Sequence, residues 1–161
     1  MIRKLPRCIQ LDATDSRIFD PCAQPGEWAV PGAFMFADIA PEAIAGKTRQ
    51  AFANGFLGIA SFGWTTLVSV ASVPEAEFEA AVTLLAQQIG RRFNPPSRAA
   101  AEAAAREELE YAAGLCEHPV NTLLALSRRL EGEHIVEQFR VVTPPGEKPH
   151  AKLWEIVADE P

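Results

Sequence analysis

The spacing of apolar positions changes several times along the chain, and the sharpest change marks a strand. Residues 61–73 follow a period of two, in which one alternating set of positions is largely apolar and the other is small without being strongly polar. A strand with two such faces is typical of the middle of a sheet that is covered on both sides. The pattern therefore predicts a central strand over residues 61–73.

A helix is predicted over residues 41–54, where apolar side chains recur at helical spacing. Pro41 suits its first turn, but Gly46 lowers helix stability by about 1 kcal/mol relative to alanine, so we expect this turn to be frayed or separate. The Asn54-Gly55 pair offers a left-handed cap at the C-terminal end.

Two longer helices are predicted next, over residues 74–93 and 97–116. The first has an apolar stripe at helical spacing and two arginines in its last turn, where cations interact favourably with the helix dipole. The second begins at Ser97, a good N-cap residue, and its apolar stripe is rich in alanine. A stripe of small residues allows close approach to another helix or to the sheet.

The other apolar runs are short and separated by turns, as expected for strands. A Pro31-Gly32 turn separates two of them, and a loop that contains Gly132 closes a hairpin. The predicted strands fall at the start of residues 7–20 and in residues 27–30, 33–37, 122–130, 135–142 and 152–157.

The predicted fold class is α+β. We expect a mostly antiparallel sheet of about six strands with three helices, in the order β-β-β-α-β-α-α-β-β-β, because helices on one face of a sheet are the usual solution for such a pattern. The chain has no internal repeat, and its prolines fall at element boundaries. We therefore expect residues 1–161 to form a single domain.

Charge and composition exclude several classes of protein. The 15 Lys and Arg residues are outnumbered by 21 Asp and Glu residues, so the net charge is -6, and an acidic chain lacks the basic footprint of a general nucleic-acid binder. No apolar run approaches the ~20 residues of a membrane-spanning helix. Acidic residues follow the basic N-terminus where a signal peptide would be apolar. We expect a cytoplasmic protein that binds neither nucleic acid nor membranes.

The chain lacks the standard phosphate, dinucleotide and nucleophile motifs, and we expect no cofactor. Glu108 stands out because it falls at the margin of the apolar stripe of the third helix, where it either reaches solvent or meets Arg128 or Arg140 of the final sheet. Two roles for Glu108 are open: a member of a structural ion pair, or a catalytic acid with a shifted pKa. In the catalytic alternative, the chain is a small enzyme of undetermined class. Its polar groups are Glu108, Tyr111 and His118, and Arg128 or Arg140 contacts an anion.

Metal ligands are few, and we expect no metal site. Cys116 and His118 lie close together in the sequence, but no CxxC or HExxH motif accompanies them. A site there would need a distant ligand such as His150. Pro119 instead favours a helix end at which His118 lies near the negative end of the dipole. The three cysteines are expected to be reduced thiols.

Aromatic residues concentrate in residues 28–36 and 52–64. Such a concentration forms either the core of an α+β domain or a pocket for an apolar or planar ligand. If they form a pocket, the candidate ligand-binding residues are Trp28, Phe34 and Trp64. Burial of both tryptophans in the core would remove the support for a pocket.

Several short segments resemble a small family of uncharacterised proteobacterial proteins, a domain of unknown function. The segments are PGEWAV at 25–30, GAF at 32–34, GFLG at 55–58, SFGW at 61–64, LCEHP at 115–119, TL at 122–123 and EQFR at 137–140. They cover most of the chain from about residue 25 to residue 142, in order. The resemblance implies a bacterial, single-domain, cytoplasmic protein and assigns no activity.

The leading hypothesis is therefore a non-catalytic module that binds a partner protein or a small apolar ligand, as a homodimer. It rests on the missing catalytic motifs, on the concentrated aromatic residues and on the alanine-rich helix. The small enzyme around Glu108 is the alternative.

Overall fold

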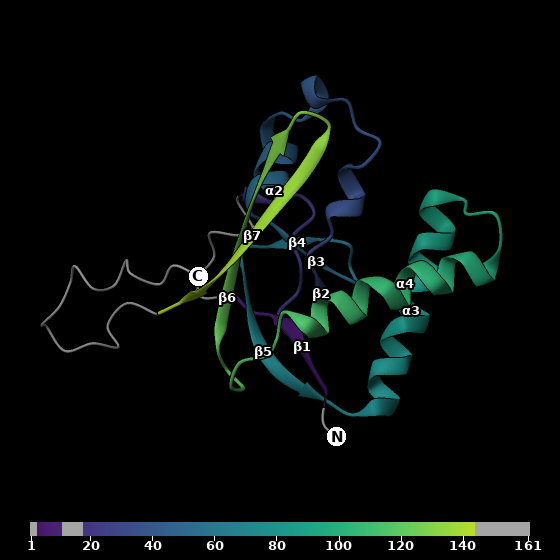
Figure 1. Ribbon diagram of the computed structural model, residues 1–161, viewed down its shortest axis with the longest axis vertical. Helices are drawn as coiled ribbons and strands as arrows, with labels where there is room; N and C mark the ends of the chain where they lie inside the picture. The colour runs from purple at the N-terminus through teal and green to yellow at the C-terminus, as the bar shows by residue number, and fades with distance from the viewer. Residues whose placement is uncertain (1–2, 11–17, 144–161) are drawn as a thin grey trace, which may run out of the picture.

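Two antiparallel sheets form the frame of the computed structural model, which describes residues 3–10 and 18–143. The larger sheet has the strand order β1-β5-β6-β7 (Figure 1). Its strands are β1 (Arg3–Cys8), β5 (Leu67–Val73), β6 (Leu123–Glu131) and β7 (His134–Val142). The smaller sheet contains β2 (Ala29–Val30), β3 (Phe56–Gly58) and β4 (Trp64–Thr65), in that order. The α+β class with antiparallel strands is thus confirmed, and the predicted strand at 152–157 lies outside the described residues.

The strand expected over residues 61–73 is divided between the two sheets. β4 belongs to the smaller sheet and β5 to the larger one. The alternation of side chains continues through both strands, so the pattern alone does not reveal the break. β5 is central, as predicted, and its two faces are covered to different degrees: Val68 and Val70 are buried, whereas Leu67, Ser69 and Ala71 on the other face are half-buried.

Both long helices lie where the sequence predicts them. α3 (Glu75–Phe93) and α4 (Arg98–Gly114) cross each other and form a helical hairpin that extends away from the sheets (Figure 1). The Ser97 hydroxyl accepts a hydrogen bond from the backbone N–H of Ala100 at 3.0 Å, as expected for an N-cap. None of the helices among the described residues is long and apolar enough to cross a membrane.

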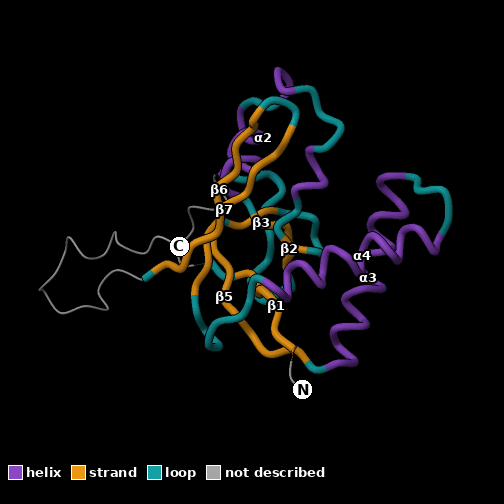
Figure 2. Tube along the Cα trace, in the orientation of Figure 1, coloured by secondary structure: helices purple, strands orange, loops and turns teal. Residues whose placement is uncertain are grey.

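The region of the first predicted helix is divided as expected. A short 3-10 helix, η2 (Pro41–Ala43), precedes α2 (Gly46–Asn54). The expected left-handed cap is wrong, because Gly55 has φ -96 in an extended conformation. Figure 2 shows the β6–β7 hairpin running past α2, and the Asn54 amide donates a hydrogen bond to the Leu126 carbonyl oxygen at 3.2 Å.

Two strand predictions near the N-terminus also need correction. The strand expected at 33–37 is instead a 3-10 helix, η1 (Ala33–Phe36), which begins after Gly32 adopts a left-handed φ of 87. The first strand begins at Arg3 rather than at residue 7. Its Pro6 is compatible with a strand because β1 lies at an edge of the sheet.

The apolar core lies on both sides of the larger sheet. One cluster joins α2, α3 and α4 to β1 and the smaller sheet, with Phe78, Leu85 and Leu109 fully buried. The other joins Val68, Val70 and their neighbours on β6 to Phe56 and Cys116. The first cluster anchors the α3–α4 hairpin along most of its length, because it includes Phe78 near the start of α3, Ile89 near its end and Ala101 in the first turn of α4.

Candidate binding groove and neighbouring polar clusters

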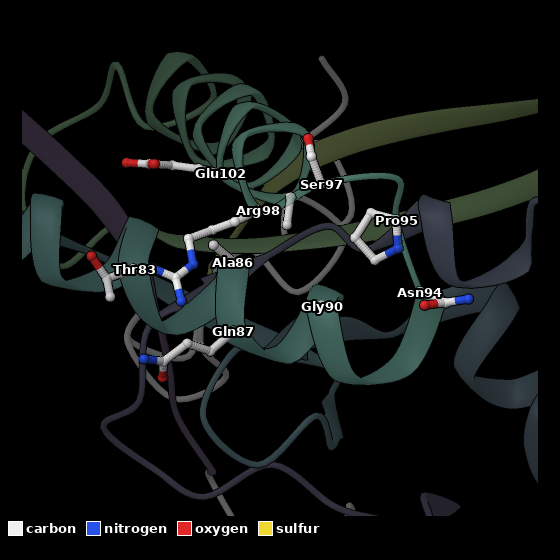
Figure 3. A pocket seen from close by; sticks show the side chains of 10 residues that line it. Thr83, Ala86, Gln87, Gly90, Asn94, Pro95, Ser97, Arg98 and Glu102 are labelled. Atoms are coloured by element: carbon white, nitrogen blue, oxygen red, sulfur yellow. The ribbon is translucent and has the colours of Figure 1, made fainter.

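A groove of about 480 Å³ runs between α3 and α4 (Figure 3). Most of its lining side chains are small or uncharged, and the charged exceptions, Arg98 and Glu102, both come from α4. The other lining residues are Thr83, Ala86, Gln87, Gly90, Asn94, Pro95, Ser97 and Ala101.

The groove exists because one side of α3 carries small residues. The apolar stripe of α3 turns inward, which leaves Ala86 and Gly90 on the side of the groove. A Cβ atom added to Gly90 would meet nothing within 4 Å, so the backbone of α3 borders open space there. This side is not among the predicted sites, although the two small residues four positions apart are visible in the sequence.

Ion pairs fasten the two helices together nearer the sheets. Arg106 donates to both carboxylate oxygens of Glu79, at 2.7 and 2.9 Å. Arg3 lies between Glu75 and Glu110, with nitrogen–oxygen distances of 3.2 and 3.0 Å. The hydrogen bond from Arg106 lowers the pKa of Glu79, and the same bond raises the pKa of Arg106. These contacts fix the register of α3 against α4.

Arg128, one of the predicted anion contacts, is a buried structural clamp. Its side chain is 0% exposed, and its Nε donates to Glu137 at 2.7 Å. The other four N–H groups donate to backbone carbonyl oxygens, those of Ala51, Phe52, Gly55 and Pro31. A guanidinium has five N–H donors, and all five are used here. Three of the acceptors lie at the C-terminal end of α2, where the last carbonyl groups of a helix need partners from outside it; the Ala51 carbonyl oxygen also accepts the Gly55 N–H.

Glu108 and Tyr111 lie beside the same ion pair. The Tyr111 hydroxyl donates to Glu137 at 3.4 Å. Burial raises the pKa of the half-buried Glu108 to about 7, with smaller contributions from the charges of Glu137 and Glu107 in the same direction and an opposing one from Arg128. The structure therefore brings three predicted residues, Glu108, Tyr111 and Arg128, together around Glu137, which is not among the predicted site residues.

His118 is separate from that cluster. It lines an open depression with Arg3, Lys4 and Cys116, and Lys4 Nζ donates to the His118 carbonyl oxygen at 2.7 Å. Burial raises the pKa of the Cys116 thiol to about 12, so the thiol is protonated at neutral pH. Among the described residues, no three His, Cys, Asp or Glu side chains are grouped to hold a metal ion. The proposed third ligand, His150, lies outside the described residues.

The three aromatic residues predicted to bind a ligand lie in different environments and do not form one pocket wall. Trp64 is buried and packs on Phe36, with a centroid distance of 5.3 Å. Trp28 is half-buried, and its Nε1 donates to Glu77 at 3.0 Å. Phe34 makes an edge contact with Phe93 at 5.7 Å. None of the three predicted aromatic residues lines the groove.

Arg140, the other predicted anion contact, is exposed on β7 opposite Ala125. It lines neither the groove nor the depression beside His118.

The family of unknown function DUF6505 matches residues 1–153. The chain belongs to this family. The match includes every element described above, and it confirms the resemblance to a domain of unknown function. No curated protein and no solved structure matches the chain.

Two of the segments that carry the resemblance to DUF6505, those at 25–30 and 61–64, meet at Glu27. One of its carboxylate oxygens accepts the Gln24 N–H and the Ser61 hydroxyl, both at 2.7 Å. The other accepts the N–H groups of Ala60 and Ser61, at 2.8 and 3.0 Å. Glu27 therefore holds the turn before β4 in place, which is a structural role.

Proposed function

We propose that this DUF6505 protein is a non-catalytic binding module of the bacterial cytoplasm that holds a protein partner in the α3–α4 groove. The observation that carries the proposal is the groove itself, which has a volume of about 480 Å³ and lies on a projecting hairpin. Small-molecule sites bury most of the ligand surface. Here Thr83, Gln87 and Gly90 are exposed, and such an open groove fits a protein segment better than an enclosed small ligand.

The polar cluster around Glu137 supports the enzymatic alternative less well. The raised pKa of Glu108 beside Tyr111 is the observation in its favour. However, all five donors of Arg128 are occupied by protein groups, so this residue has none left for an anionic substrate. Neither Glu108 nor Tyr111 lines the groove. We therefore assign this cluster a structural role.

The alanine-rich helix, which the sequence offers as a packing surface, is not the surface that binds the partner. The alanine stripe of α4 is used within the protomer, because Ala101, Ala105 and Ala112 are buried in the same cluster as residues of α3 and β1. The groove face of the hairpin is the surface that is left for a partner.

The test is site-specific photo-crosslinking in cells that produce the protein. A benzoylphenylalanine replaces Gln87, which is exposed in the groove, and a matched control replaces Glu133, which is exposed in the β6–β7 turn. We expect a protein adduct from position 87 and none from position 133. The proposal is wrong if position 87 gives no protein adduct, or if both positions give the same adducts.

A further inference from the structure

The α3–α4 hairpin is electrically polarised along its length. Its outer part, residues 80–101, contains three arginines and no acidic residue. Its inner part, residues 75–79 and 102–110, contains seven glutamates and one arginine. A positive tip and a negative base on one element are complementary to the same element in reversed orientation.

The exposed side of α4 repeats this complementarity at the level of single residues. Arg98, Glu102, Arg106 and Glu110 follow one another at intervals of four residues, with alternating charge. Positions i and i+4 form one of the ridges by which helices pack, and two such ridges interdigitate in the commonest class of helix packing. This ridge borders the groove, which Arg98 and Glu102 line.

Alternating charges select one antiparallel register. When two copies of the ridge run in opposite directions about a point between Glu102 and Arg106, Arg98 faces Glu110 and Glu102 faces Arg106, and each pair occurs twice. A shift of four residues would place Glu102 opposite Glu102 and Arg98 opposite Arg106, which is repulsive. Like charges at an interface suppress incorrect alignments.

The charges on the ridge are available to a second copy. Neither Arg98 nor Glu102 has an ion pair among the described residues, and both are exposed. Arg106 and Glu110 have partners within the protomer, Glu79 and Arg3, but these pairs remain open to solvent. The same register sets the positive tip of one hairpin along the negative base of the other.

We infer that the protein partner in the groove is a second copy of this chain, with the two α4 helices antiparallel and Arg98 of each copy paired with Glu110 of the other. This inference rests on the proposed function, because it names the occupant of the same groove. The interface is isologous, so each contact is made twice about a two-fold axis.

Charge reversal tests the pairing directly. Arg98→Glu and Glu110→Arg each place like charges together twice, and we expect each variant alone to weaken the dimer about tenfold or more. In an equimolar mixture, both contacts of the mixed dimer are attractive, because the two introduced side chains pair with each other and the two remaining native side chains do the same. Native mass spectrometry distinguishes the mixed dimer by mass, and circular dichroism verifies that each variant is folded.

The controls separate this pairing from general electrostatics and from folding defects. Arg129→Glu reverses the charge of an exposed arginine on β6, which is not part of the α3–α4 hairpin. We expect this variant to form the dimer as the wild type does. In the double variant R98E/E110R, every copy carries both charge reversals. Attractive pairs then form between two identical copies, and we expect the dimer to be restored. The two positions are about 18 Å apart along the helix, so they do not pair within a protomer. The wild-type dimer weakens from ~0.05 M to ~0.5 M salt.

A chain that is monomeric at all concentrations overturns the inference, as does a dimer that both charge reversals leave intact. If position 87 crosslinks to a different protein while the chain is monomeric, the inference fails and the proposed function stands. If position 87 captures no protein, both fail.

Discussion

Replacement of Glu108 by glutamine should stabilise the protein at neutral and alkaline pH. The carboxyl group of Glu108 is half-buried on α4, and Glu137 and Glu107 add repulsion to the cost of burial. Arg128 offsets only part of this cost, because its Nε is already paired with Glu137. Glutamine keeps the shape of the side chain and cannot ionise.

The size and sign of the effect follow from the two pKa values. Glu108 has a folded pKa of about 7 against an ordinary value of 4.5. Its contribution to the free energy of unfolding is therefore fully present below pH 4.5 and is lost as the pH rises through 7. At about 1.36 kcal/mol per pH unit, the loss between pH 5 and pH 8 is about 2.5 kcal/mol. Solvent screening of a half-buried group reduces this to about 1.5 kcal/mol.

The assay is urea denaturation of wild type and Glu108→Gln at pH 5, 6, 7 and 8. The difference in free energy of unfolding between variant and wild type should grow with pH by about 1.5 to 2.5 kcal/mol. Glu133→Gln is the control at an exposed glutamate in the β6–β7 turn that does not act on Glu108, and its difference should change much less with pH. Parallel curves for wild type and Glu108→Gln, or a variant that is less stable at pH 8, would refute the reasoning.

Three further predictions concern other parts of the structure. Arg128→Met should destabilise the fold by about 3 to 5 kcal/mol in urea denaturation, because it removes the buried partner of the Glu137 carboxylate and the donor of hydrogen bonds to four carbonyl groups. Gly63→Ala should cost about 2 to 3 kcal/mol, because its Cβ atom would overlap the Cys22 carbonyl carbon. Gly90→Ala on α3 is the comparison variant, because a Cβ atom there meets no other atom within 4 Å, and it should stabilise the helix by about 0.5 to 1 kcal/mol. Alkylation of Cys116 at pH 8, followed by peptide mass spectrometry, should be about a hundredfold slower in the folded than in the unfolded protein.

Each of these expectations has a clear contrary result. A free energy of unfolding for Arg128→Met within about 1 kcal/mol of wild type would show that the clamp contributes little. Equal stability of the Gly63→Ala and Gly90→Ala variants would contradict the close packing at the first position. Rapid labelling of Cys116 in the folded protein would show that its thiol is accessible.

The long helices could be predicted because their determinants are local. The apolar spacing of α3 and the Ser97 cap of α4 lie within the elements that they specify. The division of residues 61–73 between two sheets could not be predicted in this way. It depends on a change of backbone direction between Thr65 and Leu67, and the alternation of side chains is the same on either side.

The polar cluster around Glu137 could be predicted from the sequence only in part. The place of Glu108 at the edge of the apolar stripe leaves three alternatives open, solvent, Arg128 or Arg140, and the structure places it near Arg128. Glu137 follows from the hairpin register, since a two-residue turn after Glu131 places Arg128 opposite Glu137. The use of all five donors of Arg128 could not be foreseen, because its carbonyl partners come from a helix end and a loop distant in the sequence.

The Arg128 clamp has a consequence for the order in which the chain is completed on the ribosome. The carbonyl groups that it satisfies lie between 73 and 97 residues earlier in the sequence. When α2 leaves the ribosome, the residue that caps its C-terminal end has not yet been synthesised. The first half of the nascent chain therefore stays incomplete until the β6–β7 hairpin emerges, and a chain truncated before Arg128 lacks the donor that fixes α2 in place.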